Sequence, residues 1–545
     1  MTDPIRVFVA RKIRTMNGSW PEATHVAVRA GRILGYGSAA EMAMFGPAVI
    51  DDRFADKIIL PGFVEGHSHA FEGMVWQHPY VGFFNRVAPD GSIVAGLKSI
   101  DAVMARLRQV AAQTAADAPI YVWGFDPIYF ADGRRMRQSD LDAVSTTRPI
   151  IVGHISGHIM NVNTTVLEQA GFSRDSNIDG LLRDTAGALT GELLGPAVMS
   201  RAARMIGGME KLRALDAPGL LRFARLASRA GVTTATDLVN ALTPPAVALL
   251  AQVTADPAFS LRLVPALNAR EYGLAEGIAR IAELRRQNTE KLHFGIVKLV
   301  ADGSIQGFTA RLRWPGYHNG APNGLWYIAP AELAGIVAAY HAAGIQLHIH
   351  TNGDEASEVA TEMIGRALSA HPRPDHRHTL QHCQMADAAI FRRMATLGMC
   401  VNLFANHIYY WGDQHQALTM GPSRAARLDA CNTALEAGVP LAIHSDAPVT
   451  PLAPLFTAWC AVNRRTASGQ VLGPEERITV AQALRAITLG AAYTLKLDHL
   501  VGSIDVGKLA DFAVLADDPM TVDPAALCDV GVHATVVGGA VFDAP

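Results

Sequence analysis

The chain has 545 residues and a formal net charge of -3, and half of its residues are hydrophobic. This length is too great for one small core and predicts a large domain together with a smaller one. The sequence contains neither a basic tract nor an apolar run of the roughly 18–20 residues that a membrane helix needs. We therefore expect neither nucleic acid nor a membrane as a partner. The partners left open are a small-molecule substrate and a second copy of the chain in a homodimer.

The five cysteines are widely spaced and include no Cys-x-x-Cys pair. This spacing favours reduced, mostly buried thiols over a disulfide framework or a cysteine zinc knuckle. The first residues lack the charged, apolar and small-residue succession of a signal peptide. Together these observations predict a cytoplasmic protein.

Short strands separated by turns are expected at both ends of the chain. Residues 4–57 have this pattern, and residues 512–515 and 534–539 repeat it. Two β segments at opposite ends of a chain can pair into one small sheet. We therefore predict a β domain made of residues 1–57 and 495–545.

Apolar runs alternate with helical patterns over residues 58–494. Buried parallel strands are continuous apolar runs in sequence, and eight strand–helix units predict a (β/α)8 TIM barrel. The eight strand candidates are residues 58–67, 232–237, 260–267, 294–300, 345–350, 378–382, 399–404 and 440–446.

Residues 72–215 interrupt this alternation. They separate the first two strand candidates by far more than the usual length of a βα connection. We interpret them as an inserted subdomain with strand-like segments of its own at 120–123 and 150–152. An insertion after the first strand would cover the carboxyl end of the barrel, where barrel enzymes carry their active sites.

The first candidate metal ligands are His67 and His69, which follow the apolar run 58–60. Side chains two apart on a strand point to the same face, so the two imidazoles can hold one cation. The alternative is a pair of polar residues in a turn. The surrounding sequence, Pro61 to His69, favours the metal site.

Lys298 lies inside the apolar run 294–300. A buried ammonium is costly unless it is paired or chemically changed. Lys298 either extends its charge to water at the strand end or is carbamylated by CO2. A carbamate would bridge two cations.

Two further histidines end the fifth and sixth strand candidates. His348 and His350 share a face of the run 346–350, and His350 is nearer the carboxyl end, so it is the better ligand. His348 is expected either to support the ligands without binding the metal or to be a core histidine. His382 is a candidate because of its position at the end of the sixth strand.

Asp446 ends the last strand candidate in the run Leu441 to Pro448. A carboxylate there can ligate a metal and also take a proton during catalysis. The alternative is a turn or helix-capping aspartate. His444 points the same way and is a candidate for substrate contact. Ligands thus fall at the ends of strands 1, 4, 5, 6 and 8.

With these residues the chain resembles the amidohydrolase superfamily, and within it the YtcJ-like branch, amidohydrolase family 3, which includes N-substituted formamide deformylase. The resemblance spans nearly the whole chain. It implies a (β/α)8 barrel, a β-sandwich built from both termini and one or two divalent metals. The motifs that carry it are PGFVEGHSH at 61–69, KLVADGSIQGFTARL at 298–312, HTNGDEA at 350–356, LQHCQ at 380–384, HSDAPVTP at 444–451 and GSIDVGKLADFAVL at 502–515.

The resemblance also implies a division of the ligands between two ions. His67, His69 and Asp446 would hold the more buried metal, His350 and His382 the second, and Lys298 would bridge them. Histidine ligands make zinc the expected metal. Two positions depart from the pattern of many relatives: Glu65 replaces aspartate and His444 replaces glycine.

These residues predict a hydrolase that cleaves a non-peptide C–N bond, with Asp446 as the proton carrier. Carboxylic or phosphate ester hydrolysis uses the same chemistry and stays open. A deaminase is disfavoured, because Gly353 stands three residues after His350, where superfamily deaminases carry glutamate. A barrel that only binds a ligand is disfavoured by the complete ligand set.

The substrate pocket has weaker candidates. His158 lies in a segment that resembles an insertion motif of this branch, and Arg311 follows Lys298 closely enough to meet a carboxylate. Trp123 and other aromatic residues of the insertion, together with those at 404–411, would suit an apolar or aromatic group if they reach the mouth. The alternative is ordinary packing of the insertion.

Overall fold

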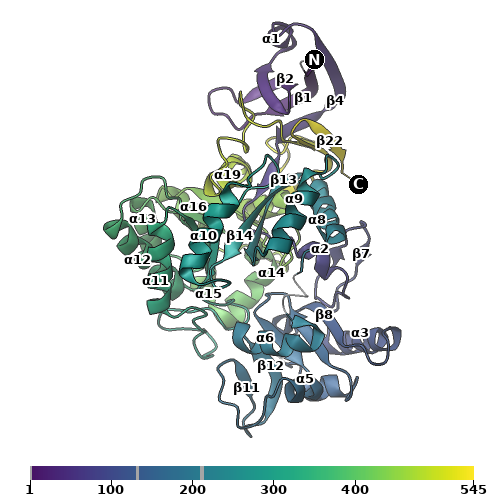
Figure 1. The fold of residues 1–545 in the computed structure, drawn as a ribbon, viewed down its shortest axis with the longest axis vertical. Helices are drawn as coiled ribbons and strands as arrows, with labels where there is room; N and C mark the ends of the chain where they lie inside the picture. The colour runs from purple at the N-terminus through teal and green to yellow at the C-terminus, as the bar shows by residue number, and fades with distance from the viewer. Residues whose placement is uncertain (1–2, 131–133, 209–213, 545) are drawn as a thin grey trace.

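The computed structural model describes residues 3–130, 134–208 and 214–544. Figure 1 shows three parts: a sheet that holds both termini, a central layer of strands surrounded by helices, and an insertion at the opposite end from the termini. The predicted insertion at 72–215 includes residues 131–133 and 209–213, which lie outside the described residues. The domain boundaries as such remain a prediction.

Both ends of the chain combine in one seven-stranded sheet with the order β22-β21-β20-β4-β1-β2-β3. Phe8 packs against Phe54 and Phe512, with ring centroids 6.1 and 6.0 Å apart, so residues distant in sequence share one core. The predicted sandwich arrangement of these strands stays a prediction. The elements are β1 (Ile5–Arg14), β2 (Glu22–Arg29), β3 (Arg32–Gly37), α1 (Ala39–Ala43), β4 (Ala48–Pro61), β20 (Phe512–Leu515), β21 (Val532–Val537) and β22 (Ala540–Asp543).

Eight parallel strands form the central sheet, in the order β19-β18-β17-β16-β15-β14-β13-β5. The sheet curls until its two ends meet: Ser68 and Ala447 form a parallel bridge, and His69 N donates to Ala447 O over 2.8 Å. The predicted α/β class and eight parallel strands are confirmed. The strands are β5 (Phe63–Glu65), β13 (Val232–Asn240), β14 (Arg262–Asn268), β15 (Ile296–Val300), β16 (Gln346–Thr351), β17 (Thr379–His382), β18 (Cys400–Leu403) and β19 (Leu441–Ile443).

The first strand candidate, residues 58–67, is two elements. Residues 58–61 belong to β4 of the terminal sheet, where Ile58 to Pro61 pair with Leu515 to Phe512. Gly62 separates β4 from β5, and an added Cβ there would lie 2.1 Å from Thr233 Oγ1. A continuous apolar run cannot show this division, because both sheets bury the strand.

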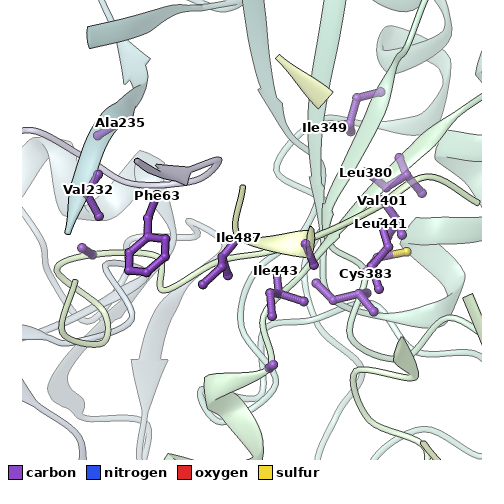
Figure 2. Close-up of a cluster of buried hydrophobic side chains, with 14 of the residues drawn as sticks. Phe63, Val232, Ala235, Ile349, Leu380, Cys383, Val401, Leu441, Ile443 and Ile487 are labelled. Atoms are coloured by element: carbon purple, nitrogen blue, oxygen red, sulfur yellow. The ribbon is translucent and has the colours of Figure 1, made fainter. Parts of the chain in front are cut away.

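Helices follow the central strands and cover the outside of the sheet (Figure 1). Figure 2 shows side chains from several strands, including Phe63, Ile349 and Leu380, gathered in one buried apolar cluster. The helices are α8 (Ala217–Arg229), α9 (Pro244–Ala255), α10 (Leu274–Arg285), α11 (Pro330–Ala342), α12 (Asp354–Ala370), α13 (Ala388–Thr396), α14 (Asn406–Gln414), α15 (Pro422–Ala425), α16 (Cys431–Glu436), α17 (Pro454–Asn463), α18 (Val480–Ala486) and α19 (Leu489–Thr494). No helix in the described parts of the chain is long and apolar enough to cross a membrane.

The insertion has a five-stranded sheet with the order β11-β12-β10-β9-β8. It contacts segments that follow the carboxyl ends of the central strands: Trp411 Nε1 of α14 donates to Asp126 Oδ2 over 3.1 Å, and Arg86 Nη2 donates to Thr450 O over 3.2 Å. Its elements are α2 (Glu72–Val75), β6 (Arg86–Val87), β7 (Ile93–Val94), α3 (Ile100–Gln113), β8 (Ile120–Phe125), α4 (Gln138–Asp142), β9 (Ile150–His154), β10 (Ile159–Val162), α5 (Thr164–Gln169), β11 (Leu181–Arg183), β12 (Leu189–Leu194) and α6 (Pro196–Ala203).

A buried ion pair joins the central sheet to the terminal sheet. Arg262 of β14 donates to Asp511, which precedes β20, and both side chains are almost fully buried. Replacing Asp511 with Ala would leave the guanidinium buried without its counter-charge. We expect a loss of about 3–5 kcal/mol in the free energy of unfolding, measured by denaturant titration. The exposed Asp517→Ala is the matched control, and equal stability of the two variants would contradict this role.

Three buried histidines, His341, His376 and His378, form a hydrogen-bonded cluster at the start of β17, the strand that His382 ends. His378 Nδ1 accepts from Leu347 N over 3.0 Å, and His378 Nε2 lies 2.8 Å from His341 Nδ1. His376 Nδ1 accepts from His378 N over 2.9 Å. Each ring therefore uses a lone pair that protonation would remove. Burial, reinforced by the neighbouring imidazoles, lowers the pKa of His378 well below its ordinary value.

This cluster should make the fold sensitive to acid. A folded-state pKa below the unfolded value means that the unfolded chain binds more protons, so stability is present above about pH 6.5 and falls as the pH drops below it. His378 alone should contribute about 1.4 kcal/mol per pH unit in that range. Unfolding titrations between pH 7 and pH 5 should show a shallower pH dependence in His378→Gln than in the parent chain. An unchanged slope in His378→Gln would refute the prediction.

Candidate metal centre

The six predicted ligands converge at one end of the central sheet. His67 and His69 follow β5, Asp446 follows β19, and the bridge between Ser68 and Ala447 brings these two segments together. The neighbouring strands supply the rest: Lys298 lies in β15, His350 in β16 and His382 at the end of β17. Parallel strands with aligned carboxyl ends are what place residues so distant in sequence side by side.

His67, His69 and Asp446 form a compact group. Asp446 Oδ1 lies 3.3 Å from Nε2 of each histidine. The three ligand atoms all lie within 4.8 Å of one another. One carboxylate oxygen thus faces two imidazole nitrogens at a single point.

The hydrogen bonds behind the two imidazoles fix their protonation. His67 Nδ1 lies 2.8 Å from Gln381 Oε1, and His69 Nδ1 lies 2.6 Å from Leu238 O. These oxygens only accept, so each Nδ1 carries the proton and each Nε2 of a neutral ring presents a lone pair. Burial lowers the pKa of His67 well below its ordinary value, so that ring is neutral.

Two imidazole nitrogens and a carboxylate oxygen meet at this point, and Asp446 Oδ1 has no hydrogen-bond partner among the described residues, so a cation between them would satisfy all three atoms. Imidazole nitrogen and carboxylate oxygen are the ligands that a structural or catalytic zinc ion accepts. A carbonyl or amide oxygen on the second ring nitrogen is the usual support of a metal-binding histidine. The residues at this site therefore fit a divalent metal.

His350 and His382 lie beside this group. Their ring centroids are 4.4 Å apart, and His382 lies equally close to His67. Asp446 Oδ2, the second carboxylate oxygen, is 3.8 Å from His382 Nδ1. Burial lowers the pKa of both histidines well below the ordinary value. They are neutral and able to ligate.

Lys298 is almost fully buried, and its Nζ has no hydrogen-bond partner among the residues that the structure describes. Burial lowers its pKa to about 7, although the Asp446 carboxylate opposes the shift. The predicted alternative in which the lysine extends to water does not agree with this burial. A neutral amine is also the form that reacts with CO2.

Two of the ligands have a strained backbone. His382 has φ +67° and Asp446 has φ +53°, in the left-handed region that costs residues with a Cβ of order 1–3 kcal/mol. Asp446 N donates to His67 O over 3.1 Å, which holds the turn against β5. This conformation aims the two side chains into the site.

Sequence reasoning missed two residues that orient the ligands. Gln381 holds His67 through Oε1, and its Nε2 lies 2.7 Å from Nδ1 of His348, whose Nε2 donates to Thr494 O over 3.1 Å. Asp302 accepts from the backbone N of Asn352 over 2.9 Å and so fixes the loop after His350. Their sequence context could have identified them, because both are polar residues inside or directly after buried strands, where a polar side chain needs a partner.

Glu65, the predicted departure from the family pattern, also orients ligands. Its Oε1 accepts from His67 N over 3.3 Å and from Ser445 N over 3.2 Å, and its Oε2 accepts from Ser445 Oγ over 2.8 Å. The carboxyl group therefore ties the segment that holds His67 to the segment that holds Asp446.

The four predicted pocket residues have different positions. The His158 ring centroid lies 5.2 Å from that of His350, so the insertion reaches the metal centre. Trp123 packs against Tyr80, with centroids 4.9 Å apart. Arg311 donates to the Glu355 carboxylate through two nitrogens at 3.0 Å each. Its charge is therefore paired within the protein and does not face a substrate carboxylate. His444 is fully buried among the ligands.

Known proteins resemble the chain along almost its whole length. A family model described as the amidohydrolase family matches residues 55–542. Protein LONG AFTER FAR-RED 3 of Arabidopsis thaliana is 28% identical over 97% of this chain and 89% of that protein. Putative amidohydrolase YtcJ of Bacillus subtilis is 25% identical over 97% of each chain. N-substituted formamide deformylase of Arthrobacter pascens is 24% identical over 98% of this chain and 97% of that protein.

The fold is shared with solved structures of low sequence identity. An uncharacterized metal-dependent hydrolase from Pyrococcus horikoshii has a TM-score of 0.71 at 18% identity, covering 95% of this chain and 99% of that chain. A mutant of atrazine chlorohydrolase TrzN from Arthrobacter aurescens, complexed with zinc and atraton, has a TM-score of 0.52 at 16% identity, covering 98% of this chain and 94% of that chain. At such identities the likeness shows the fold alone. The match of the family model over most of the sequence decides the affiliation, and the chain belongs to the amidohydrolase family.

Proposed function

We propose that this protein is a metal-dependent hydrolase that cleaves a non-peptide C–N bond of amide type in a small substrate. The observation that carries the proposal is the convergence of two histidine lone pairs and the Asp446 carboxylate at one buried point. The relatives support it, because one of them is named an N-substituted formamide deformylase.

In this proposal the ligands form two sets that Lys298 connects. His67, His69 and Asp446 would hold one ion, His350 and His382 a second, and carbamylated Lys298 would bridge them. Zinc is the expected metal for such ligands. Bound divalent ions supply two things, a lowered pKa of water and polarisation of the scissile carbonyl.

The two carboxylate oxygens of Asp446 face different groups, so one can bind the metal and the other can carry a proton. Its Oδ1 faces His67 and His69, whereas its Oδ2 is turned toward His382 at 3.8 Å. We assign Oδ2 to take the proton from the attacking water and to pass it to the leaving nitrogen. The products are a carboxylate and an amine. His158, beside His350, is placed to stabilise the negative charge that develops on the carbonyl oxygen.

A narrow cavity between the insertion and the barrel mouth supports a substrate with an apolar or aromatic group. Its volume of about 20 Å³ leaves room for little more than a water molecule, so side chains must move apart to admit an aryl group. Val449 and Pro451 follow Asp446 closely and line it. The other lining residues are Tyr80, Phe83, Phe84, Asn85, Arg86, Gly124, Tyr129, Ile155, Tyr410 and Trp411.

Ester hydrolysis is the second candidate, because the same ligands and the same proton carrier would serve it. Deamination is less well supported. At Gly353, where deaminases of the superfamily carry glutamate, an added Cβ would lie 1.7 Å from Arg311 O. The loop therefore has no room for a carboxylate side chain at that position.

Metal analysis combined with a substrate panel tests the proposal. The panel contains N-substituted formamides and other N-acyl amines, matched carboxylic and phosphate esters, and aminated heterocycles. We expect hydrolysis of amides that carry an apolar or aromatic substituent, loss of activity with a chelator, and recovery with zinc. Turnover of the esters alone would favour the second candidate. Full activity in metal-stripped protein would overturn both.

A further inference from the structure

His444 is a buried histidine whose polar atoms the proposed ligand set does not use. Its relative exposure is 0%, and neither ring nitrogen has a hydrogen-bond partner among the described residues. The ring is stacked between His67, at 4.6 Å and 18°, and Phe404, at 4.8 Å and 21°. Leaving a buried polar atom unsatisfied costs about 1–3 kcal/mol, so the position requires an explanation.

A neighbouring histidine shows that burial in this region does not by itself leave a ring unsatisfied. His407 also packs against Phe404, with its centroid 4.8 Å from that ring. Its Nδ1 lies 2.9 Å from His415 Nε2, and His415 Nδ1 lies 2.7 Å from Thr419 Oγ1. His444 lacks such a network among the described residues, although it lies at a similar depth.

His444 lies among the candidate metal ligands. His67, His382 and His444 each offer a nitrogen, and these atoms all lie within 4.8 Å of one another. The ring centroid of His444 lies 5.0 Å from that of His382, whose two nitrogens also have no partner within the described part of the chain. Three neutral imidazoles in contact, with several lone pairs that face no donor, form a site for a cation.

His67 determines which cation this is. Its Nδ1 carries a proton toward Gln381, so Nε2 is its one lone pair. Taking this atom as the one that His67 offers in both groups places His444 beside the ion that His67 shares with His69 and Asp446, while His382 stays assigned to the second ion. We propose that His444 is a further ligand of this ion. The inference rests on the metal centre of the proposed function.

A further nitrogen ligand has a chemical consequence. Each imidazole added in place of water or oxygen makes the site favour zinc, cobalt or nickel over magnesium or manganese. The site of this chain should therefore hold its ion more tightly than one without a side-chain ligand at position 444. The preference for a late divalent metal should be correspondingly stronger.

The test compares His444→Phe and His444→Ala with the parent chain and with His407→Phe. The Phe variants keep a stacked ring and remove the nitrogens, and the Ala variant avoids overfilling the buried site. All four proteins are loaded with zinc or cobalt. Metal per chain is measured by elemental analysis, zinc affinity by competition with a chelator, and the ligand field by the visible spectrum of the cobalt form.

We expect both His444 variants to bind zinc at least about 10–100-fold more weakly than the parent, the range already seen when a group that only supports a metal ligand is removed, and to have an altered cobalt spectrum. His407→Phe should retain the parent affinity and spectrum. Unchanged affinity and spectrum in folded His444→Phe and His444→Ala would overturn the proposal. A raised KM with unchanged metal binding would do so too, and would assign His444 to the substrate instead.

These outcomes are separable from the fate of the proposed function. If the parent binds metal through His444 but hydrolyses nothing in the amide and ester panel, the proposed activity fails and the ligand assignment stands. If the parent hydrolyses amides while the His444 variants keep their metal, the ligand assignment fails and the activity stands.

Discussion

Replacing Asp446 with Asn should lower kcat by roughly two to four orders of magnitude, the range for a lost general acid–base. The amide side chain retains an oxygen that can face His67 and His69, where Oδ1 now lies 3.3 Å from each Nε2. It loses the second carboxylate oxygen, which is the one assigned to carry the proton. Turnover of the best amide from the panel should therefore collapse while most of the bound metal remains.

Steady-state kinetics and elemental analysis on the same preparation measure both effects. Asp52→Asn, an exposed position in the terminal sheet, controls for the loss of an aspartate elsewhere. Full activity of Asp446→Asn would refute its role as proton carrier. Loss of all metal together with activity would contradict the expected metal retention and show that the Asn side chain cannot replace the carboxylate as a ligand.

The fold was predictable where burial is uniform. Strands such as β15 and β16 are buried on both faces, so their apolar runs identify them directly. The same uniformity caused the error at residues 58–67. Ile58 to Leu60 are as apolar as Phe63 and Val64, yet they pair with β20 in the other sheet. Only a long-range contact, absent from a local pattern, tells the two apart.

The sequence predicts which residues lie at the site, but not their backbone conformations or hydrogen-bond partners. Ligands at strand ends could be named because all eight strands run parallel and their carboxyl ends meet. The conformations at His382 and Asp446, with positive φ, have no signature in sequence, because His and Asp are tolerated in many backbone states. The pairing of Gln381 with His67 and His348 depends on which faces meet after folding.

The second large effect is expected at Lys298. Its Nζ is buried without a partner among the described residues, and burial lowers its pKa to about 7. A plain amine at the centre of five candidate ligands would repel cations when protonated and add little when neutral. A carbamate would supply the missing negative charge and two oxygens, one for each ion. Lys298→Met should therefore lose metal, with kcat lowered at least about 100-fold, the upper range for residues that support metal binding.

Isotope-labelled bicarbonate gives this prediction a readout that does not depend on activity. The parent chain should show a carbamate carbon signal in the NMR spectrum, and Lys298→Met should not. Lys291→Met is the matched control, since Lys291 Nζ donates to Phe259 O over 2.7 Å, away from the ligands; its carbamate signal, metal content and activity should match the parent. A parent chain that binds two ions without a carbamate signal would show that Asp446 and the histidines hold the metals alone. Lys298 would then act as a neutral amine beside them, and the bridge between the two ions would have to come from solvent.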